Sequence, residues 1–469
     1  MRRIGVCGLG LLLAAVAVAE SSWPQFRGHG ARGHADGPPP PLTWDVESGE
    51  NIRWSVPIPG LGHASPIVAG SKIFIATAIG KGAAELKTGL YGSPKPVDDE
   101  GEQQWVLLAL DRATGQIAWG KTAVTASPAS KRHPKSSHAN STPVTDGERV
   151  CVFYGTPGLF CYRVADGVQL WSKEFGLLSA GSYNLRAAEW GFGNSLSLHD
   201  GVLLVQADTQ ELGFIAAFDV TDGRQLWRRE RDDVSTWSTP TVHVGAERSQ
   251  VIVNGFRHIG GYDLRTGDPL WKLRGGGDVP VPTPFVADDL IFITNSHGLV
   301  SPTYAIELDA EGEIVPDYNA LGRGEAPPKG IRWAKTKGGG YMVTPIVVDG
   351  RLYVLRNNGI FTVYDTRSGT ELHQGRLSGS HAFTASPVAV GKRVYFTAES
   401  GEVFVVEAGE TLEILARNPL GIQTLSTPAI ADGTIYFRTR DSLIAVGETA
   451  SETAASEMVT TEAVATSID

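Results

Sequence analysis

Short apolar runs separated by turn residues recur along most of the chain. Examples are the segments KIFIAT, RVCVFY, LIFITN, RLYVLR, RVYFTA and TIYFRT, which are flanked by Gly, Asp, Asn and Ser residues. Apolar runs this short, rich in β-branched and aromatic residues, are typical of buried strands. Few stretches have a long helical period. The pattern therefore predicts an all-β protein whose strands are joined by tight turns.

Two further elements alternate with these runs. The first is Ser/Thr-Pro followed by an apolar strand, and its copies begin near residues 65, 142, 195, 239, 283, 344, 386 and 427, with Leu196 replacing the proline in the third copy. The second is a turn that precedes a tryptophan, as in ALDRATGQIAW, CYRVADGVQLW, AFDVTDGRQLW and GYDLRTGDPLW. Weaker copies are AIELDAEGEI, VYDTRSGTELH and VVEAGETLEI. Such self-similarity predicts a series of equivalent supersecondary units.

Each unit is interpreted as four antiparallel strands. Proline lacks an amide donor, so it suits an innermost strand that faces a central channel. In the turn before the fourth strand, Asp accepts backbone N–H groups and Gly adopts a positive φ. The tryptophan of the fourth strand is then expected to dock on the neighbouring unit and to be buried there. The residues predicted to dock the units are Trp54, Trp119, Trp171, Trp227 and Trp271, with Gly115, Gly167, Gly223 and Gly267.

The number of units indicates the closed shape. Eight copies begin with the Ser/Thr-Pro element, and the last one, TPAIADGTIYFRTRDSLIAVGE, stops after three strands. The segment NIRWSVPI (51–58) supplies a fourth strand with Trp54 in the docking position. Closure by the two chain ends leaves no sheet half-paired. The sequence therefore predicts an eight-bladed β-propeller over residues 51–448, closed by an N-terminal strand.

Two glycine motifs that suggest nucleotide binding lack the necessary context. GQIAWGKT (115–122) fits the phosphate-loop pattern, but the segment after it contains Pro128 and Pro134 and has no helical period. A phosphate loop needs a helix at that point. GHGARG (28–33) has no strand before it. We interpret Gly115 as a turn glycine of the repeat, and we predict no nucleotide site.

The chain ends and the charge narrow the protein class. Residues 1–19 have Arg2 and Arg3, an apolar run and a small-residue ending, which is typical of a secretory signal peptide cleaved after Ala19. Removing two arginines and no acid changes the net charge from −10 to −12, which disfavours nucleic acid as a partner. Residues 20–50 form an irregular lead, and the acidic tail 449–469 is predicted to be disordered. No later stretch is long and apolar enough to span a bilayer.

The A-x-D-x-x-T-G-x-x-x-W pattern of residues 109–119 resembles the tryptophan-docking motif of the PQQ-like repeat propellers. The resemblance covers residues 51–448, and WPQFRG (23–28) is similar to the opening of exported bacterial members. One branch of this family is quinoprotein dehydrogenases, which hold pyrroloquinoline quinone (PQQ) and Ca²⁺. Another comprises proteins similar to BamB, a scaffold of the outer-membrane β-barrel assembly machinery.

The choice between these branches depends on residues outside the repeat. Quinoprotein dehydrogenases typically carry two adjacent cysteines and a longer chain, whereas no Cys-Cys pair occurs here. The lipid-attachment cysteine of the BamB-like branch is also missing. The resemblance implies a monomeric, exported, non-catalytic scaffold of the periplasm or cell envelope that binds protein partners, with no cofactor, metal or catalytic residue. The alternative is a PQQ- and Ca²⁺-dependent dehydrogenase.

Two cysteines remain after the predicted cleavage. Cys151 and Cys161 fall on consecutive strands of one blade, at positions where other copies have residues such as Phe74 or Ala217. They are either buried small apolar residues or a cross-strand disulfide formed in an oxidising compartment.

Long insertions interrupt the repeats and are the expected binding regions. Segments 80–104, 120–139 and 172–192 are predicted on one face, here called the top face, and 315–330 on the other face or the rim. The candidate partner-binding residues are Lys131, Arg132, His138, His63, His381, Tyr183, Arg186, Trp190 and Trp237. Of these, His63, His138, Trp237 and His381, together with Tyr341, are expected to surround the channel mouth.

Overall fold

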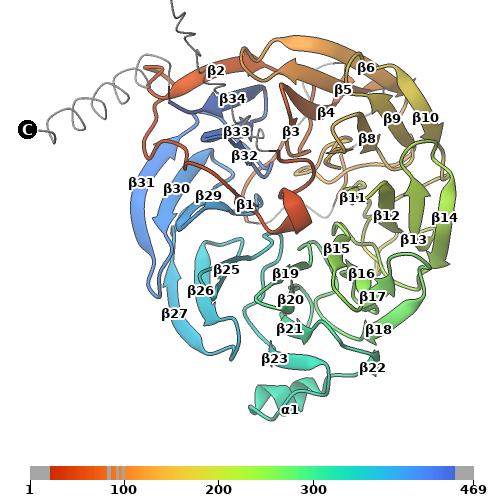
Figure 1. The fold of residues 1–469 in the computed structure, drawn as a ribbon, viewed down its shortest axis with the longest axis vertical. Coiled ribbons are helices and arrows are strands. Elements are labelled where there is room, and N and C mark those ends of the chain that lie inside the picture. The colour runs from red at the N-terminus through yellow and green to blue at the C-terminus, as the bar shows by residue number, and fades with distance from the viewer. Residues whose placement is uncertain (1–21, 82–85, 91–94, 98–100, 449–469) are drawn as a thin grey trace, which may run out of the picture.

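The computed structural model describes residues 22–81, 86–90, 95–97 and 101–448. The predicted signal peptide and the acidic tail therefore lie outside the described residues. Eight four-stranded antiparallel sheets are arranged around a central channel, as Figure 1 shows. The prediction of an eight-bladed β-propeller is confirmed. Within the described part of the chain, neither helix is long and apolar enough to cross a bilayer.

The strands of each blade run from the channel outward. Blade one consists of β3 (Ile67–Ala69), β4 (Lys72–Gly80), β5 (Gln103–Asp111) and β6 (Ile117–Ala126). Blade two consists of β7 (Val144–Thr145), β8 (Arg149–Phe153), β9 (Leu159–Arg163) and β10 (Gln169–Lys173). Blade three consists of β11 (Ser197–His199), β12 (Val202–Asp208), β13 (Gly213–Asp219) and β14 (Gln225–Glu230), and blade four of β15 (Thr241–Val244), β16 (Ser249–Val253), β17 (Ile259–Asp263) and β18 (Pro269–Leu273).

The other four blades follow the same order. Blade five consists of β19 (Phe285–Ala287), β20 (Leu290–Thr294), β21 (Thr303–Glu307) and β23 (Ile331–Lys335). Blade six consists of β24 (Ile346–Val348), β25 (Arg351–Leu355), β26 (Ile360–Asp365) and β27 (Glu371–Arg376). Blade seven consists of β28 (Val388–Val390), β29 (Arg393–Thr397), β30 (Glu402–Glu407) and β31 (Glu413–Pro419), and blade eight of β32 (Ala429–Ala431), β33 (Thr434–Arg438), β34 (Ser442–Val446) and β2 (Ile52–Pro57).

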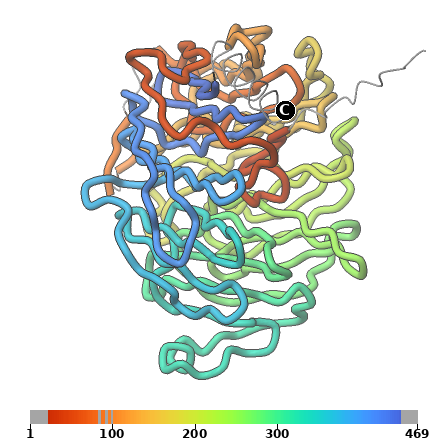
Figure 2. The backbone as a smooth tube through the Cα atoms, turned by 60° about the vertical axis from the view of Figure 1, so that its left-hand side comes forward, coloured from red at the N-terminus to blue at the C-terminus, as the bar shows by residue number. Residues whose placement is uncertain are grey.

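The ring closes through the pairing of β2 with β34. Ser55 lies opposite Ile444 in this antiparallel pair, so the N-terminal strand completes the eighth blade as predicted. Figure 2 shows the red N-terminal part of the chain beside the blue C-terminal part. Two blades carry a fifth strand, because β1 (His34–Ala35) pairs in parallel with β28 and β22 (Gly312–Ile314) pairs in parallel with β18. The short helix α1 (Tyr318–Gly322) follows β22 at the rim, within the insertion 315–330.

Burial explains why the strands have different sequence patterns. The two middle strands of a blade are covered on both sides by the neighbouring blades, so β12 is almost continuously buried. An outer strand has one face toward solvent, and β2 accordingly alternates between half-buried and exposed positions. The apolar runs of the sequence therefore mark middle strands.

The repeat motif docks five of the eight blades on the next blade. The indole of Trp227 donates to the carbonyl oxygen of Leu264 at 3.0 Å and lies against Gly267 of the following blade. Gly267 has a φ of +73°, and a Cβ there would lie 2.5 Å from the indole. Glycine is thus required both by the turn and by the close approach of the ring. The same arrangement joins Trp54 to Gly115, Trp119 to Gly167, Trp171 to Gly223 and Trp333 to Gly369.

Three details of the docking differ from the sequence interpretation. Trp54, Trp119 and Trp171 are half-buried rather than fully buried, because the outer strand leaves part of each indole at the rim. Trp271 is buried but donates to the Gln250 side chain of its own blade. The next blade, blade five, has the insertion 315–330 in place of the full turn motif. Its strand β22 pairs with β18, the strand of Trp271. Trp333 and Gly369 form a docking pair that the sequence reasoning did not include.

The lead segment is ordered and crosses the channel. Trp23 pairs with Val68 of blade one, and His34 contacts the carbonyl oxygen of Val347 in blade six. Its short 3₁₀ helix η1 (His29–Ala31) packs on β15 and β19. Figure 1 shows this red segment at the centre of the ring. These contacts of the lead segment involve the innermost strands of the blades. They lie on the face of the ring where the first strand of each blade turns into the second, and we call this face the bottom face.

Candidate functional site

The three predicted insertions come together on the top face. Residues 81–102 connect β4 to β5, and the other two connect β6 to β7 and β10 to β11. Residues 120–126 are part of β6 rather than of a loop, so the second insertion begins only at residue 127. Lys121 of the apparent phosphate loop lies in that strand, and no helix follows it. The interpretation of GQIAWGKT as part of the repeat is therefore confirmed.

Hydrogen bonds join the insertions into one layer, which we call the top-face layer (residues 86–90, 95–97, 127–139 and 174–192). The N–H of Val97 donates to the carbonyl oxygen of Arg132 at 2.8 Å. The N–H of His133 donates to the Trp190 carbonyl at 3.1 Å, and the Lys131 N–H donates to the Glu189 carboxylate at 2.7 Å. These hydrogen bonds fix the loops relative to one another.

A buried ion pair fastens this layer to blade seven, beyond the neighbouring blade eight. Lys135 Nζ lies 2.6 Å from Glu399 Oε1 of blade seven, and the Glu399 side chain is only 2% exposed. The other carboxylate oxygen accepts the N–H of Gly89 at 2.7 Å, and Thr384 donates to the carboxylate as well. The layer therefore reaches from blades one and two across the channel mouth to blade seven.

An aromatic cluster forms the inner edge of the layer. The rings of Trp190 and Trp237 have centroids 5.8 Å apart, and His133 packs edge-on against Trp190. Trp237 Nε1 donates to the carbonyl oxygen of Gly191 at 2.7 Å, which holds the ring in place. Trp190 Nε1 is buried and has no hydrogen-bond partner.

The cluster borders a cavity of about 600 Å³ in the top half of the channel. Phe26 of the lead segment contributes to the wall from the bottom side. His63, Trp190, Trp237 and Tyr341 line the cavity, so four residues of the sequence analysis meet at one site. The polar part of the wall also includes a ring of Ser and Thr residues together with His133, Lys135, Asn140, His297 and Asn357. Phe26 was missed because nothing in its sequence context indicates the channel.

The other candidate residues do not line the cavity. His138 packs against Trp105, and His381 pairs with Glu402 at 3.2 Å. Arg132 is 1% exposed and donates to the carbonyl oxygen of Ser136, so it organises its loop rather than presenting a surface charge. Lys131 and Arg186 are exposed, and Arg186 lies 3.4 Å from Glu211.

Exposed apolar side chains lie on the top face beside the cavity. Tyr183 and Leu185 of the third insertion are 44% and 55% exposed, and Leu299 of blade five is fully exposed. The Tyr183 hydroxyl donates to Asp278 at 3.1 Å, and Asp278 also pairs with His297, two residues before Leu299. We call Tyr183, Leu185 and Leu299 the apolar patch.

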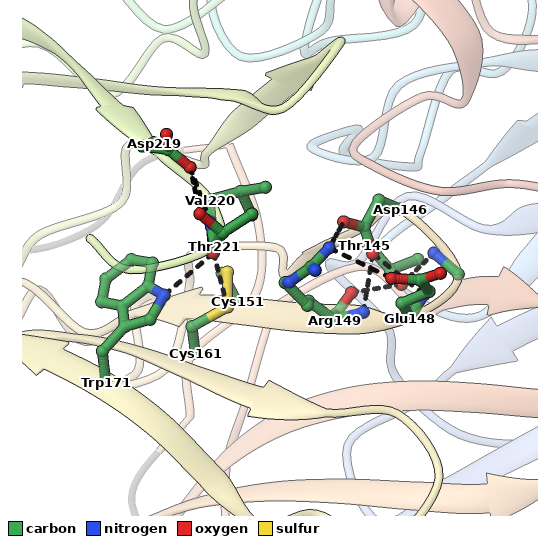
Figure 3. The surroundings of a disulfide bond; sticks show 11 residues. Thr145, Asp146, Glu148, Arg149, Cys151, Cys161, Trp171, Asp219, Val220 and Thr221 are labelled. Atoms are coloured by element: carbon green, nitrogen blue, oxygen red, sulfur yellow. Dashed lines mark hydrogen bonds and ion pairs between the residues drawn. A yellow bond between two sulfur atoms is a disulfide. The ribbon is translucent and has the colours of Figure 1, made fainter. Parts of the chain in front are cut away.

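Cys151 and Cys161 form a disulfide bond, which decides between the two alternatives left open by the sequence. They lie directly opposite each other on β8 and β9, with Cα atoms 4.1 Å apart. Figure 3 shows the disulfide beside Trp171, whose indole donates to the carbonyl oxygen of Val220 at 2.9 Å. The bridge is fully buried, and Cys161 Sγ lies 4.0 Å from the carbonyl oxygen of Val220 in blade three.

His63 is held neutral at the cavity wall. Burial lowers its pKa to about 3, and the charges of Arg438, Arg132 and Lys135 act in the same direction. Because the unfolded chain has a histidine pKa of about 6.5, the unfolded state binds more protons between these two pH values. The stabilisation that accompanies neutral His63 is complete above about pH 6.5 and is lost as the pH falls toward 3.

We therefore expect acid to destabilise the protein partly through His63. Below pH 6.5 this residue should contribute a slope of about 1.4 kcal/mol per pH unit to the free energy of unfolding. Urea denaturation from pH 7 to pH 5 should give a smaller slope for His63→Gln than for the unmodified protein. His199→Gln, at a partly exposed position on β11, is the control. Equal slopes for all three proteins would contradict the assignment.

Within the described residues, no group of three His, Cys, Asp or Glu side chains is placed to hold a metal ion. The GHGARG segment forms only η1 and connecting turns, without the strand and long helix of a dinucleotide site.

Comparison with known proteins places this architecture in a family. The profile of the family described as "Outer membrane protein assembly factor BamB" matches residues 102–309 and 313–453, which is more than half of the chain. Outer membrane protein assembly factor BamB of Yersinia pestis is 21% identical over 271 residues, which cover 47% of this chain and 66% of that protein. The chain thus spans slightly less than two thirds of this relative.

Two solved structures have the same fold. BamB from Moraxella catarrhalis superposes with a TM-score of 0.50 and 13% identity, covering 79% of this chain and 98% of that one. The quinohemoprotein alcohol dehydrogenase ADHIIG from Pseudomonas putida HK5 has a TM-score of 0.55 and 12% identity, covering 92% of this chain and 81% of that one. At such identities the similarity concerns the fold alone.

Proposed function

Because the chain belongs to the family of outer membrane protein assembly factor BamB, we propose that it is a non-catalytic scaffold that binds protein partners of the bacterial envelope. The partners bind at the top face, where the top-face layer and the apolar patch lie together. The protein acts as a monomer in the periplasm or at the cell envelope, after cleavage of a signal peptide at Ala19. No nucleic acid, cofactor or metal is required.

The apolar patch is the observation that carries this proposal. Side chains as exposed as Leu299 and Leu185 gain from contact with a partner, because apolar surface is then removed from water. Tyrosine and arginine are enriched among residues that dominate binding energy, and Tyr183 and Arg186 lie on the same loop. The bonds of His133 to Trp190 and of Lys131 to Glu189 join this loop to the second insertion, which the Lys135–Glu399 ion pair anchors. The loop is therefore held in place, which lowers the entropic cost of binding.

Replacement of the apolar patch is therefore expected to weaken partner capture. The variant Tyr183→Ser, Leu185→Ser, Leu299→Ser should recover at least about tenfold less partner, a loss of roughly 1.4 kcal/mol or more. The measurement is co-purification from crosslinked envelopes of the source organism, with quantitative mass spectrometry of outer-membrane assembly subunits.

The matched control is Val168→Ser, Leu170→Ser on the outer edge of blade two, where the two side chains are 44% and 41% exposed. This variant also loses exposed apolar surface, but far from the top face, and should capture partners normally. Equal recovery by the patch variant and the unmodified protein would place the binding surface elsewhere.

The exposed charged residues of the insertions are better tested by point replacements than by shortening the loops. Shortening the second insertion would remove buried Arg132 and the Lys135–Glu399 pair, so it would also disturb the fold. Point replacements at exposed positions such as Lys131 and Arg186 avoid this effect. Charge reversal at these positions is expected to change mainly the association rate and its salt dependence.

The alternative, a PQQ- and Ca²⁺-dependent dehydrogenase, makes an opposite prediction. Titration of the purified protein with PQQ and Ca²⁺, followed by dye-linked assays with alcohols and sugars, should give no turnover. Stoichiometric quinone uptake with turnover would replace the scaffold proposal.

A further inference from the structure

The channel cavity is lined by an eightfold ring of hydroxyl groups. The Ser or Thr at the start of each blade's first strand contributes one hydroxyl, and all of them face the cavity: Ser65, Thr142, Ser195, Thr239, Thr283, Thr344, Ser386 and Thr427. The repeat unit therefore places the same donor group on every blade. Phe26 of the lead segment, which crosses the channel, is also part of the cavity wall.

Hydrogen bonds between blades determine which of these hydroxyl groups can still donate a hydrogen bond to a ligand. Six hydroxyl oxygens accept a backbone N–H from the preceding blade at 2.9 to 3.3 Å: those of Thr142, Ser195, Thr283, Thr344, Ser386 and Thr427. Within the described part of the chain, no acceptor is recorded for the eight O–H protons. The ring thus presents donors toward the cavity.

Two buried nitrogen atoms at the same wall also lack hydrogen-bond partners. Trp190 Nε1 and His63 Nε2 are buried without a hydrogen bond, and both side chains line the cavity. A buried polar group without a partner is costly, so such groups indicate an absent ligand or water. The cavity wall includes Lys135, whose charge is paired with the buried Glu399. No Asp or Glu side chain lines the cavity, although the protein as a whole has a net charge of −10.

A further buried cation lies at the bottom of the channel. Arg27 follows Phe26 directly, is fully buried, and packs its guanidinium over Phe285 at 5.5 Å. Its Nε and Nη1 atoms have no hydrogen-bond partner, and no described carboxylate forms an ion pair with it. The charge therefore adds a positive potential to this part of the channel.

The wall also has an apolar and aromatic part. Trp190, Trp237 and Phe26 provide ring surfaces, and Val279, Met342 and Leu425 provide aliphatic contacts. A cavity of about 600 Å³ lies in the range of sites for small ligands. A matching ligand needs oxygen acceptors at one end and a flat or apolar group at the other.

We propose that this cavity binds a carboxylate carried beside an aromatic group. The carboxylate accepts from the hydroxyl ring and Trp190 Nε1, and the aromatic group packs against Trp190 and Trp237. Two sources share this chemistry, a free aromatic acid and an acidic, aromatic segment of a protein partner. The proposal does not depend on the scaffold function, since either source fits the same pocket.

Calorimetric titration with matched probes tests the proposal. Indole-3-acetate is compared with the neutral indole-3-acetamide, and acetyl-Phe-Glu-amide with acetyl-Phe-Gln-amide. The acid that represents the true ligand is expected to bind at least about tenfold more tightly than its amide. Hydrogen bonds to an ionised carboxylate are stronger than those to a neutral amide. Binding of indole-3-acetate indicates a free acid, and binding of the Glu peptide alone indicates a partner segment. Both outcomes support the pocket.

Three variants remove donors with little effect on the fold. Thr239→Val and Ser65→Ala remove ring hydroxyls that accept no recorded backbone N–H, and Trp190→Phe removes an unpaired N–H but retains an aromatic ring. Each should weaken binding of the acid about tenfold with an unchanged melting temperature. Thr125→Val, at an exposed position of β6, is the control. No saturable binding of either acid, equal binding of acids and amides, or binding that none of the three variants weakens would overturn the proposal.

Discussion

Replacing Trp227 with alanine is expected to lower the free energy of unfolding by about 3–5 kcal/mol. The indole is 6% exposed and lies between blades three and four, among Leu204, Ala217 and Val251. Its removal leaves a cavity at the interface and leaves the Leu264 carbonyl without its donor. Urea denaturation followed by circular dichroism measures the loss.

The neighbouring Leu226→Ala is the control for this prediction. Leu226 lies on the same strand, β14, but is 39% exposed, so its replacement should change stability by about 0.5 kcal/mol or less. A Trp227→Ala protein as stable as this control would contradict the docking role.

Gly267 provides an independent test of the same contact. Its substitution by alanine places a Cβ against the Trp227 ring and at an unfavourable positive φ. The ring clash is absent when Trp227 is already alanine. Gly267→Ala should therefore cost less in the Trp227→Ala background than in the unmodified protein, and strictly additive losses would show that the two residues are uncoupled.

The blades could be predicted because their determinants are local. In the first copy, Asp111 accepts the N–H groups of Ala113 and Thr114, and Gly115 has a φ of +72° a few residues later. Both features depend only on residues within one turn. The same holds for the proline at the channel-facing strand, so the repeat fixes strand order and the position of the docking tryptophan in the sequence itself.

The lead segment could not be predicted for the opposite reason. His34 contacts the Val347 carbonyl across 313 positions of the chain, and neither residue carries a pattern that indicates the other. Trp23 and Phe26 were recognised as part of a family-like opening, but their place at the channel emerges only when the ring has closed. Long-range packing of an irregular segment has no periodic signal.

The candidate site was predicted in location but only partly in its residues. The insertions indicated the top face, because long loops on a rigid scaffold are easily recognised. Which side chain faces the cavity depends on loop conformation, and this separates His63 and Trp237 from His138 and His381. Arg132 was predicted to bind a partner, whereas it is buried and its carbonyl oxygen and guanidinium form hydrogen bonds inside the top-face layer.

A buried charge cluster between blades three and four gives the other large expected effect. Arg231 Nε lies 2.8 Å from Asp208, its Nη2 lies 3.2 Å from Asp233, and the side chains of all three are fully buried. Tyr262 accepts from Arg231 at 2.9 Å. Burial alone would lower the pKa of Arg231, but Asp208, Tyr262 and Asp233 raise it, so the guanidinium stays charged.

Arg231→Met is expected to destabilise the protein by about 3–5 kcal/mol at pH 7, because it leaves two buried carboxylates without their cation. Arg229→Met is the matched control two positions earlier, where the pair with Asp268 is exposed to solvent and should contribute less than about 1 kcal/mol. Urea denaturation at constant pH measures both losses. Equal effects of the two variants would refute a special role for the buried cluster.

The pH dependence distinguishes charge from packing in this variant. Burial raises the pKa of Asp233 even when Arg231 is present, and loss of the arginine should raise it further. An acid whose pKa is higher in the folded state than in the unfolded state favours folding when protonated, so stability is regained as the pH falls. The deficit of Arg231→Met should therefore shrink between pH 7 and pH 5, whereas a loss caused only by packing would stay constant over that range.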